Sequence, residues 1–297
     1  MIRLGTRGSA LALAQARLVA DRLGGVELVP IKTSGDRRVD PAEDKSRFVK
    51  EIEDALLAGE VDLAVHSAKD VPADLPDGLS IVGVPARADP RDALCGAATL
   101  DELPGGATVG TSSLRRRAQL LALRPDLEVL DLHGNVDTRL GRLAAGDYDA
   151  VVLAAAGLER LGRPHEGVPV PAARMVPAPG QGCLVLEART GDERMTETAG
   201  RLTDQDALAS LLAERAVVAA LGATCRTPIG ALATGHGDGG LRLTAFAGLP
   251  DGSHWIGDSL DGDAGAPRDL GHEVASRLMA AGAAELLAEA ERAATPQ

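Results

Sequence analysis

Two segments that lie far apart in the chain carry side chains able to do chemistry. The segment VDLAVHSAKDVP contains Asp70, and the segment LGATCRTPIG contains Cys225. A carboxylate held just beyond the end of a strand can stabilise a cation that develops during a reaction, and it can also exchange protons. A polar turn capped by Asp70 fits the same residues. The neighbouring Lys69 could bind an anionic substrate group or could simply be solvated.

Three cysteines, Cys95, Cys183 and Cys225, are spaced too widely for a zinc site, and their odd number argues against a complete disulfide framework. Cys225 follows a predicted helix end, where the helix dipole disfavours a thiolate, although the adjacent Arg226 favours one. A small buried side chain is the commonest role of a lone cysteine. The residue types alone therefore do not identify Cys225 as reactive.

A third segment, GTSSLRRRAQLLALRPDL, places three arginines in the first turn of a predicted helix. Positive charge is unfavourable there, because the helix dipole already makes this end positive. A bound anion would offset it, and the free N–H groups of a helix N-terminus bind anions. Arg115 and Arg116 suit bidentate binding of a carboxylate, with Ser112 and Ser113 as further donors. An N-capped amphipathic helix with a basic first turn fits the same residues.

Four more polar residues lie at or near predicted junctions between strands and helices. They are Arg7 and Ser9 in GTRGS, Arg139 in HGNVDTR and Arg160 in GLERLG. Each by itself is typical of a protein surface. Together they could line one cleft and bind a ligand that carries several carboxylates.

The composition limits the classes of function. With 297 residues, 45% apolar and 25% charged, the chain is long enough for two or three domains of an ordinary globular protein. A net charge of −12 argues against a general nucleic-acid binder. No apolar run reaches the length of a membrane span, and MIRLGTRGSA does not read as a secretory signal. We therefore expect a cytoplasmic protein whose bunched arginines form a local positive cleft.

The elements that must position these residues alternate in the first half of the chain. Strands are expected at residues 2–4, 26–33 and 61–65, and helices at residues 10–23 and 48–58, the first of them capped by Ser9. This alternation predicts a parallel sheet with ligands at the carboxyl ends of its strands. Asp70 lies just beyond such an end.

The pattern then restarts and finally changes. Strands at residues 107–110, 127–132 and 148–154, with helices at 114–123 and 139–145, predict a second α/β domain. Proline-rich segments near residues 85–90 and 176–181 are typical of hinge crossings, after which residues 183–188 could return to the first sheet. Helices at 205–221 and 270–293, the latter broken near Gly282, flank strands at 231–234, 241–247 and 254–259. These strands predict antiparallel pairing in a small α+β domain.

Taken in order, these segments resemble the porphobilinogen deaminase (hydroxymethylbilane synthase) family. The resemblance rests on IRLGTRGSALALAQA, FVKEIEDALLAGEVDLAVHSAKDVP, DPRDAL, GTSSLRR, GNVDTRL, YDAVVLAAAGLERLG, PAPGQG and CRTPIG, and it runs through nearly the whole chain. It implies two periplasmic-binding-protein-like α/β domains joined by hinges, plus a small C-terminal α+β domain with a three-stranded antiparallel sheet. The implied domains are residues 1–86 with 183–200, residues 91–177, and residues 203–297.

The resemblance also implies an activity. Members of this family are transferases that condense four porphobilinogen molecules head to tail into linear hydroxymethylbilane and release ammonia, in the biosynthesis of tetrapyrroles such as haem. A dipyrromethane made from the substrate itself, and held covalently on a cysteine, primes the reaction. No metal, nucleic acid or membrane is implied. A monomer that hands its product to uroporphyrinogen III synthase is expected.

The site residues implied by the resemblance follow from matching positions. Cys225 matches the cofactor attachment site, and Asp70 matches the catalytic aspartate. Positions that hold the cofactor are matched by Lys69, Ser113, Arg115, Arg116, Arg139, His133 and, in a loop over the cleft, Lys45. Positions on the substrate side are matched by Arg7, Ser9, Gln15 and Arg160, with Gln181 in a hinge.

Three departures from the family pattern leave an alternative open. His133 stands where the family usually has arginine, so binding of a carboxylate there is expected to be weaker and pH-dependent. The loop of residues 37–47 is short and lacks a Gly-Gly pair, and GATC replaces the common Gly-Gly-Cys. A diverged paralogue that binds an anionic pyrrole with weak or altered activity is the alternative. A solute-binding protein also suits two hinged domains, but it would require a secretory signal and no third domain.

Overall fold

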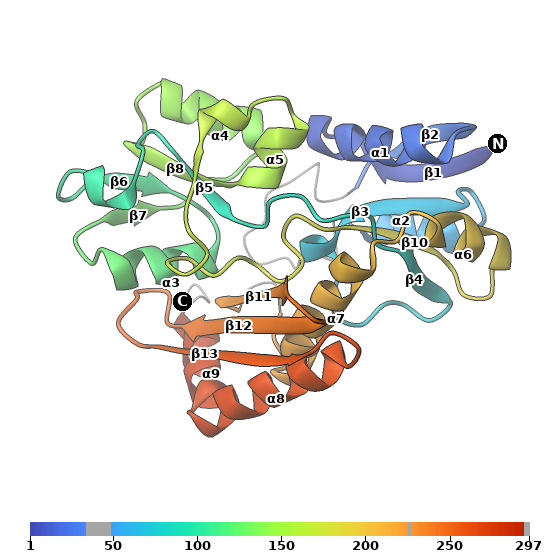
Figure 1. The fold of residues 1–297 in the computed structure, drawn as a ribbon. Coiled ribbons are helices and arrows are strands. Elements are labelled where there is room, and N and C mark those ends of the chain that lie inside the picture. Colours follow the sequence, from blue (N-terminus) through green and yellow to red (C-terminus); the bar gives the residue numbers. More distant parts are fainter. Residues whose placement is uncertain (34–48, 225–226, 294–297) are drawn as a thin grey trace. The chain divides into compact units, whose positions relative to one another are not determined.

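The computed structural model describes residues 1–33, 49–224 and 227–293. The chain divides into two compact units, whose helices and strands are labelled in Figure 1. Unit 1 comprises Met1–Ala88 and Gly182–Ala209, and unit 2 comprises Asp89–Gln181 and Ser210–Gln297. The first two boundaries between the units fall in or beside the proline-rich segments near residues 85–90 and 176–181. The finer division into three domains stays a prediction.

Unit 1 contains a five-stranded sheet with the strand order β2-β1-β3-β10-β4 among the described residues. Its strands are β1 (Ile2–Arg7), β2 (Val26–Ile31), β3 (Leu63–Ser67), β4 (Leu79–Gly83) and β10 (Leu184–Arg189). β1 is parallel to β2 and β3, as predicted, but β10 is antiparallel to both β3 and β4. The predicted parallel pairing is therefore confirmed for β1, β2 and β3, and β10, which comes from the returning chain, makes the sheet a mixed one. The predicted return of residues 183–188 to this sheet is confirmed.

The helical elements of unit 1 alternate with its strands along the chain. Within the described residues they are α1 (Ala10–Leu23), α2 (Lys50–Leu57), the short 3-10 turn η3 (Ala68–Asp70) and α6 (Glu193–Gly200). The predicted cap of α1 is confirmed, since Ser9 Oγ accepts the N–H of Ala12 at 3.3 Å. Leu63 and Val65 of β3 belong to the same apolar cluster as Ala16 of α1.

The alternation of side chains along β3 decides which helix each of them meets. Ala64 packs in a separate cluster with Ile52 and Leu56 of α2, so α1 and α2 cover opposite faces of this strand. His66 follows Ala64 by two residues and therefore lies on the α2 face. The carboxyl ends of the parallel strands β1 and β3 lead directly into α1 and η3, respectively.

Unit 2 contains a second five-stranded sheet among its described residues, with the order β7-β6-β8-β5-β9. The strands are β5 (Asp92–Cys95), β6 (Thr108–Gly110), β7 (Glu128–Leu130), β8 (Ala150–Ala154) and β9 (Val168–Pro169). Its helical elements are η4 (Leu100–Glu102), α3 (Leu114–Leu123), α4 (Val136–Ala144), α5 (Ala155–Arg160) and η5 (Pro164–Glu166). β6 is parallel to β7 and β8, whereas β5 is antiparallel to β8 and β9.

The C-terminal part of unit 2 forms the predicted antiparallel sheet, with the order β11-β12-β13. Its strands are β11 (Ile229–His236), β12 (Gly240–Gly248) and β13 (Trp255–Asp263), and each is longer than predicted. The helices are α7 (Gln205–Ala220), which begins in unit 1 and continues into unit 2, α8 (Pro267–Ala280) and α9 (Ala283–Ala293). The predicted break is confirmed at Gly282, whose φ of +97° favours glycine. The fold is therefore the mixed α/β architecture expected, with a small α+β part.

Several elements differ from the sequence-based expectation. α4 begins at Val136 rather than at Arg139, because the side chain of Asn135 accepts the N–H of Thr138 at 2.9 Å and caps the helix. The segment after β3, expected to be a loop, contains the turn η3. β4, β5, β9 and α6 were not predicted.

None of the helices within the described ranges is both long enough and apolar enough to cross a membrane.

Close packing between β4 and α6 gives a test of the fold. A Cβ added at Gly83 would lie 2.6 Å from the carbonyl oxygen of Ala199, so Gly83→Ala should force the helix away from the sheet. We expect a loss of about 1–3 kcal/mol in the free energy of unfolding. Gly200→Ala is the matched control, because nothing lies within 4 Å of its added Cβ. Urea unfolding of both variants measures the difference, and equal stability would contradict this packing.

Candidate active site

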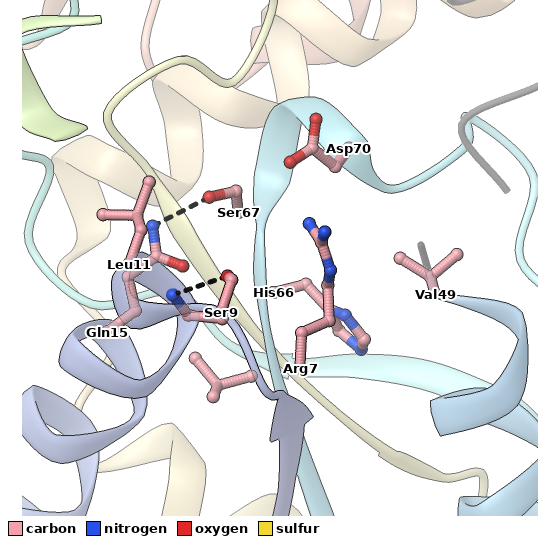
Figure 2. A pocket seen from close by; sticks show the side chains of 10 residues that line it. Arg7, Ser9, Leu11, Gln15, Val49, His66, Ser67 and Asp70 are labelled. Carbon is pink, nitrogen blue, oxygen red and sulfur yellow. Dashed lines mark hydrogen bonds between the residues drawn. The ribbon is translucent and has the colours of Figure 1, made fainter. Parts of the chain in front are cut away.

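A pocket in unit 1 brings together four of the predicted site residues. Arg7, Ser9, Gln15 and Asp70 line it, as Figure 2 shows. Further lining residues are Leu11, Ala12, Val49, Val65, His66 and Ser67. The pocket lies where the parallel strands β1 and β3 end, which is the edge of the sheet at which ligands were expected.

The local fold explains why these side chains meet. Arg7 is the last residue of β1, and Ser9 begins α1 two residues later. Gln15 lies on the buried face of α1, and its Nε2 donates a hydrogen bond to Ser67 Oγ at 2.9 Å. This bond links α1 to the end of β3 across the pocket. The side chains of the two chain segments are thus held in fixed relation to each other.

Asp70 ends the turn η3, which immediately follows β3. The N–H of Val71 donates to the carbonyl of Ala68 at 3.2 Å and closes this turn. Figure 2 shows the guanidinium group of Arg7 pointing toward the Asp70 carboxylate. Asp70 and Lys69 are both half-buried. A carboxylate beside a cation at a pocket that opens to solvent can meet both charges of a zwitterionic substrate.

In unit 2, the arginines of the segment GTSSLRRR turn inward. Arg115 and Arg116 are 4% and 5% exposed and both bind Asp92, which is fully buried at the start of β5. Arg115 Nη1 donates to Asp92 Oδ2 at 2.7 Å, and Arg116 donates to Oδ1 through Nε at 2.9 Å and Nη2 at 2.8 Å. Ser113 caps α3, because its Oγ accepts the N–H of Arg116 at 3.5 Å.

The group formed by Asp92, Arg115 and Arg116 carries one positive charge in excess. Burial by itself raises the pKa of Asp92, but the charges of the two arginines, with hydrogen bonds from Arg115 and Gln181, outweigh it and hold that pKa well below its usual range. Gln181 Nε2 donates to Asp92 Oδ1 at 2.9 Å and to the carbonyl of Pro90 at 2.8 Å. Arg115 Nε is buried and has no hydrogen-bond partner among the described residues. One donor of this guanidinium is therefore left unsatisfied within the described residues.

The remaining predicted residues of unit 2 lie elsewhere in that unit. His133 is exposed in the loop before α4, and Arg139 Nε donates to the carbonyl of Gly134 at 2.8 Å. Gly134 has a φ of +110°, which glycine adopts readily, so this loop can fold back on the side chain. Arg160 is half-buried at the end of α5.

Two predicted residues, Cys225 and Lys45, lie outside the described residues, as do Arg226 and the loop of residues 37–47. The other two cysteines, Cys95 and Cys183, are buried, and burial raises the pKa of the Cys95 thiol to about 11. Neither fits the role of a reactive thiolate. A single cleft lined from both α/β domains stays a prediction.

Sequence reasoning missed two residues that the structure brings into these groups. Asp92 was part of the segment DPRDAL, and its signal was an acid opening the apolar run DALC, where a carboxylate needs a buried counter-charge. His66 was part of VDLAVHSAKDVP, where its position two residues after Ala64 placed both side chains on the same face of a buried strand.

The Asp92 group predicts a large loss of stability on neutralisation. Asp92→Asn leaves two buried guanidinium groups without a counter-charge and should lower the free energy of unfolding by about 3–5 kcal/mol. Because the pKa of Asp92 is depressed, its contribution is present above its unfolded pKa and is lost only in strong acid. Denaturant unfolding at about pH 5 and about pH 8 should therefore give the same deficit.

Asp126→Asn is the control for this prediction, since Asp126 forms an exposed ion pair with Arg124 and should contribute little. A stable Asp92→Asn protein would show that the two arginines do not depend on this carboxylate.

Comparison with known proteins covers almost the whole chain. Residues 2–197 match the family model "Porphobilinogen deaminase, dipyromethane cofactor binding domain", and residues 208–280 match "Porphobilinogen deaminase, C-terminal domain". A porphobilinogen deaminase of Thermus thermophilus is 48% identical, over 97% of this chain and 99% of the relative. Those of Rubrobacter xylanophilus and Deinococcus radiodurans are 47% and 46% identical, each over 96% of this chain and over 95% and 97% of the relative.

The solved structures that resemble the chain are more distant. The second substrate binding domain of a putative amino acid ABC transporter from Streptococcus pneumoniae is 13% identical, with a TM-score of 0.40 over 74% of this chain and 94% of that one. A TM-score of this size supports no inference about function. The two family models and the three relatives, in contrast, span nearly the full length. The chain belongs to the porphobilinogen deaminase family.

Proposed function

We propose that this protein is a transferase that condenses four porphobilinogen molecules head to tail into linear hydroxymethylbilane, with release of ammonia, in tetrapyrrole biosynthesis. The observation that carries the proposal is the pocket at the ends of β1 and β3, which gathers Arg7, Ser9, Gln15 and Asp70. These are the residues that match the family's catalytic and substrate-side positions in unit 1. Membership of the porphobilinogen deaminase family supports the same reaction.

The chemistry of the substrate explains the charges in the pocket. Porphobilinogen is a pyrrole with an acetate, a propionate and an aminomethyl group. Loss of ammonia from the aminomethyl group leaves an electron-poor azafulvene. The carboxylate of Asp70 stabilises the developing positive charge and accepts hydrogen bonds from pyrrole N–H groups. Arg7, with Ser9 and Gln15 beside it, binds the carboxylates of the substrate and orients its ring.

The family implies a covalent dipyrromethane, and the charges of unit 2 fit such a group. Arg115 has a buried Nε without a described partner, and the Asp92 group has one uncompensated positive charge. A carboxylate of the cofactor would satisfy both. When bound, the dipyrromethane supplies the pyrrole carbon to which the first substrate unit is joined. Cys225 is the proposed attachment site on the strength of its motif.

The other matched residues take supporting roles in this proposal. Ser113, Arg139 and Lys69 bind cofactor carboxylates together with Arg115 and Arg116. His133 serves in place of the family's usual arginine, with fewer donors. On the substrate side, Arg160 binds a carboxylate. Gln181 keeps the Asp92 group oriented through its two hydrogen bonds. Lys45, in the loop of residues 37–47, also binds the cofactor.

We also propose where the enzyme acts, its oligomeric state and which enzyme takes up its product. A cytoplasmic monomer suits a water-borne dicarboxylate substrate and an acidic surface. The linear product needs an enzyme that closes its ring, which is the reaction of uroporphyrinogen III synthase. The alternative of a diverged paralogue with weak activity gains no support from the described residues, because Asp70 and its pocket are intact.

Replacement of Asp70 tests the catalytic assignment. Asp70→Asn keeps the size of the side chain but removes the charge that stabilises the cation, so ammonia release from porphobilinogen should fall by about 100-fold or more. The exposed Asp74, four residues further on, provides the control Asp74→Asn, which should keep full turnover. Full turnover by folded Asp70→Asn protein would overturn the role given to this carboxylate.

Replacement of Cys225 tests the cofactor assignment. The intact mass of the denatured protein should exceed the sequence mass by two condensed porphobilinogen-derived units, and Cys225→Ser should lack this increase. Cys95→Ser is a suitable control, because a buried thiol with a raised pKa should not carry the group. An unmodified wild-type mass after incubation with porphobilinogen or preformed hydroxymethylbilane would contradict the proposal.

A further inference from the structure

Behind the pocket of unit 1 lies a buried group of three titratable side chains, Glu53, His66 and Glu187, which the proposed chemistry does not use. Their exposures are 5%, 5% and 1%. Among the described residues, Glu53 Oε1, His66 Nε2 and both carboxylate oxygens of Glu187 have no hydrogen-bond partner. Unsatisfied buried polar groups are costly, so four such atoms in one place call for a functional explanation.

The sheet register brings two members of this group together. His66 of β3 lies opposite Val185 of β10, and Ala64 lies opposite Glu187, so His66 and Glu187 are diagonal neighbours on one face. Their Nε2 and Oε2 atoms are 3.1 Å apart, which is an ion-pair distance when His66 is protonated, in an orientation that forms no hydrogen bond. The same face of the sheet packs against α2, which carries Glu53.

The group is connected to the pocket through two of its lining residues. His66 itself lines the pocket, and Figure 2 shows its ring beside the side chain of Arg7. Val49, which also lines the pocket, accepts the backbone N–H of Glu53 at 2.9 Å and lies one helical turn before it on the same face. Glu53 is therefore buried about one turn of helix behind the pocket wall.

Two buried carboxylates beside each other do not both ionise easily. Burial, with the negative charge of Glu187 added, raises the pKa of Glu53 to about 7, and His66 opposes this shift. The other charged groups near Glu53 are few. Asp54 is exposed on the same helix, and Arg189 of β10 is bound to the carbonyls of Leu56 and Val61.

A metal ion is not indicated as the explanation, because the described residues include no group of three or more His, Cys, Asp or Glu side chains placed to hold one. A proton that exchanges on this group is the remaining explanation for its buried, unsatisfied atoms. With Glu53 protonated, this side chain adds no charge to the wall behind the pocket. With Glu53 ionised, the same buried region gains one negative charge, close to where the carboxylates of the substrate must bind.

We propose that Glu53 is a positioning residue for the reaction: buried beside His66 and Glu187 behind the pocket, it keeps the pocket wall at His66 and Arg7 able to accept an anionic substrate. Glu53 does not touch the substrate and acts through its neighbours. This inference rests on the proposed function for its substrate. The inference goes beyond the proposed function because it assigns a role to a residue outside the pocket.

The test compares the pH dependence of KM for porphobilinogen in the wild-type holoenzyme and in Glu53→Gln, which mimics the protonated form. KM of the wild type should rise by about three- to tenfold relative to Glu53→Gln as pH increases from about 6 to about 9, with kcat little affected. Asp54→Asn, on the exposed side of the same helix, should follow the wild type. A Glu53→Gln profile equal to that of the wild type would overturn the proposal.

Glu187→Gln provides a second, independent variant in case Glu53→Gln does not fold. Without the neighbouring negative charge, Glu53 ionises at lower pH, so the rise in KM should move to more acidic conditions. A profile that stays in the wild-type position would contradict the proposal. A purely structural role of Glu187 would alter stability or kcat without moving this profile.

Infrared spectroscopy gives a readout that does not depend on activity. The difference between wild type and Glu53→Gln should show a protonated carboxyl band at about pH 6 that disappears by about pH 9. Absence of that band at the lower pH would overturn the proposal. A wild type that binds porphobilinogen without turning it over would refute only the proposed function, and its dissociation constant would then replace KM in the same comparison. A wild type that neither binds nor turns over porphobilinogen would refute both.

Discussion

The interior of unit 2 depends on one carboxylate. Asp92 is fully buried, and it accepts hydrogen bonds from Arg115, Arg116 and Gln181. Each arginine also donates to a backbone carbonyl, Arg115 to Val176 and Arg116 to Val152, so the same charges connect α3 to β5, β8 and the segment before β10. An uncompensated guanidinium could not be placed there. The chain can bury two arginines in this unit only because β5 begins with an acid.

Unit 1 has to accommodate buried carboxylates rather than buried guanidinium groups. In the proposed reaction its pocket stabilises a cation with Asp70 and binds carboxylates with Arg7, within a protein whose net charge is −12. Two further carboxyl groups, Glu53 and Glu187, are buried nearby, where full ionisation would oppose an anionic substrate. Burial itself raises the pKa of Glu53, because a charged carboxylate is poorly stabilised away from water. The two units thus accommodate buried charge differently, since unit 2 pairs ions around Asp92 and unit 1 buries Glu53 where its pKa is raised.

Local sequence signals predicted much of this architecture. The helix cap at Ser9, the helix at residues 114–123, the return of residues 183–188 to the first sheet and the break at Gly282 all follow from nearby residues. β4, β5 and β9 were missed because they are short, and their stability comes from pairing with strands distant in sequence. Propensity and periodicity carry no information about such partners.

The sequence indicated several residues of the site, but it did not indicate the contacts that others make. Residue type and position at strand ends indicated Arg7, Ser9 and Asp70, and the resemblance to the family added Gln15. The inward turn of Arg115 and Arg116 was not predictable, because basic residues in a first helical turn are usually solvated, and only the tertiary fold brings Asp92 to them. The contact of His66 with Glu187 likewise depends on strand register, which a sequence does not state.

The position of β10 within the first sheet also affects how the protein is made. β10 lies between β3 and β4, although 100 residues lie between Gly83 and Leu184 in the chain. On the ribosome, which releases the chain from its N-terminus, the first sheet therefore lacks an inner strand until residues 184–189 emerge. All five strands of the second sheet, residues 92–169, are synthesised before that moment. The sheet that begins first in the sequence is thus completed second, and its unpaired edges need protection during synthesis.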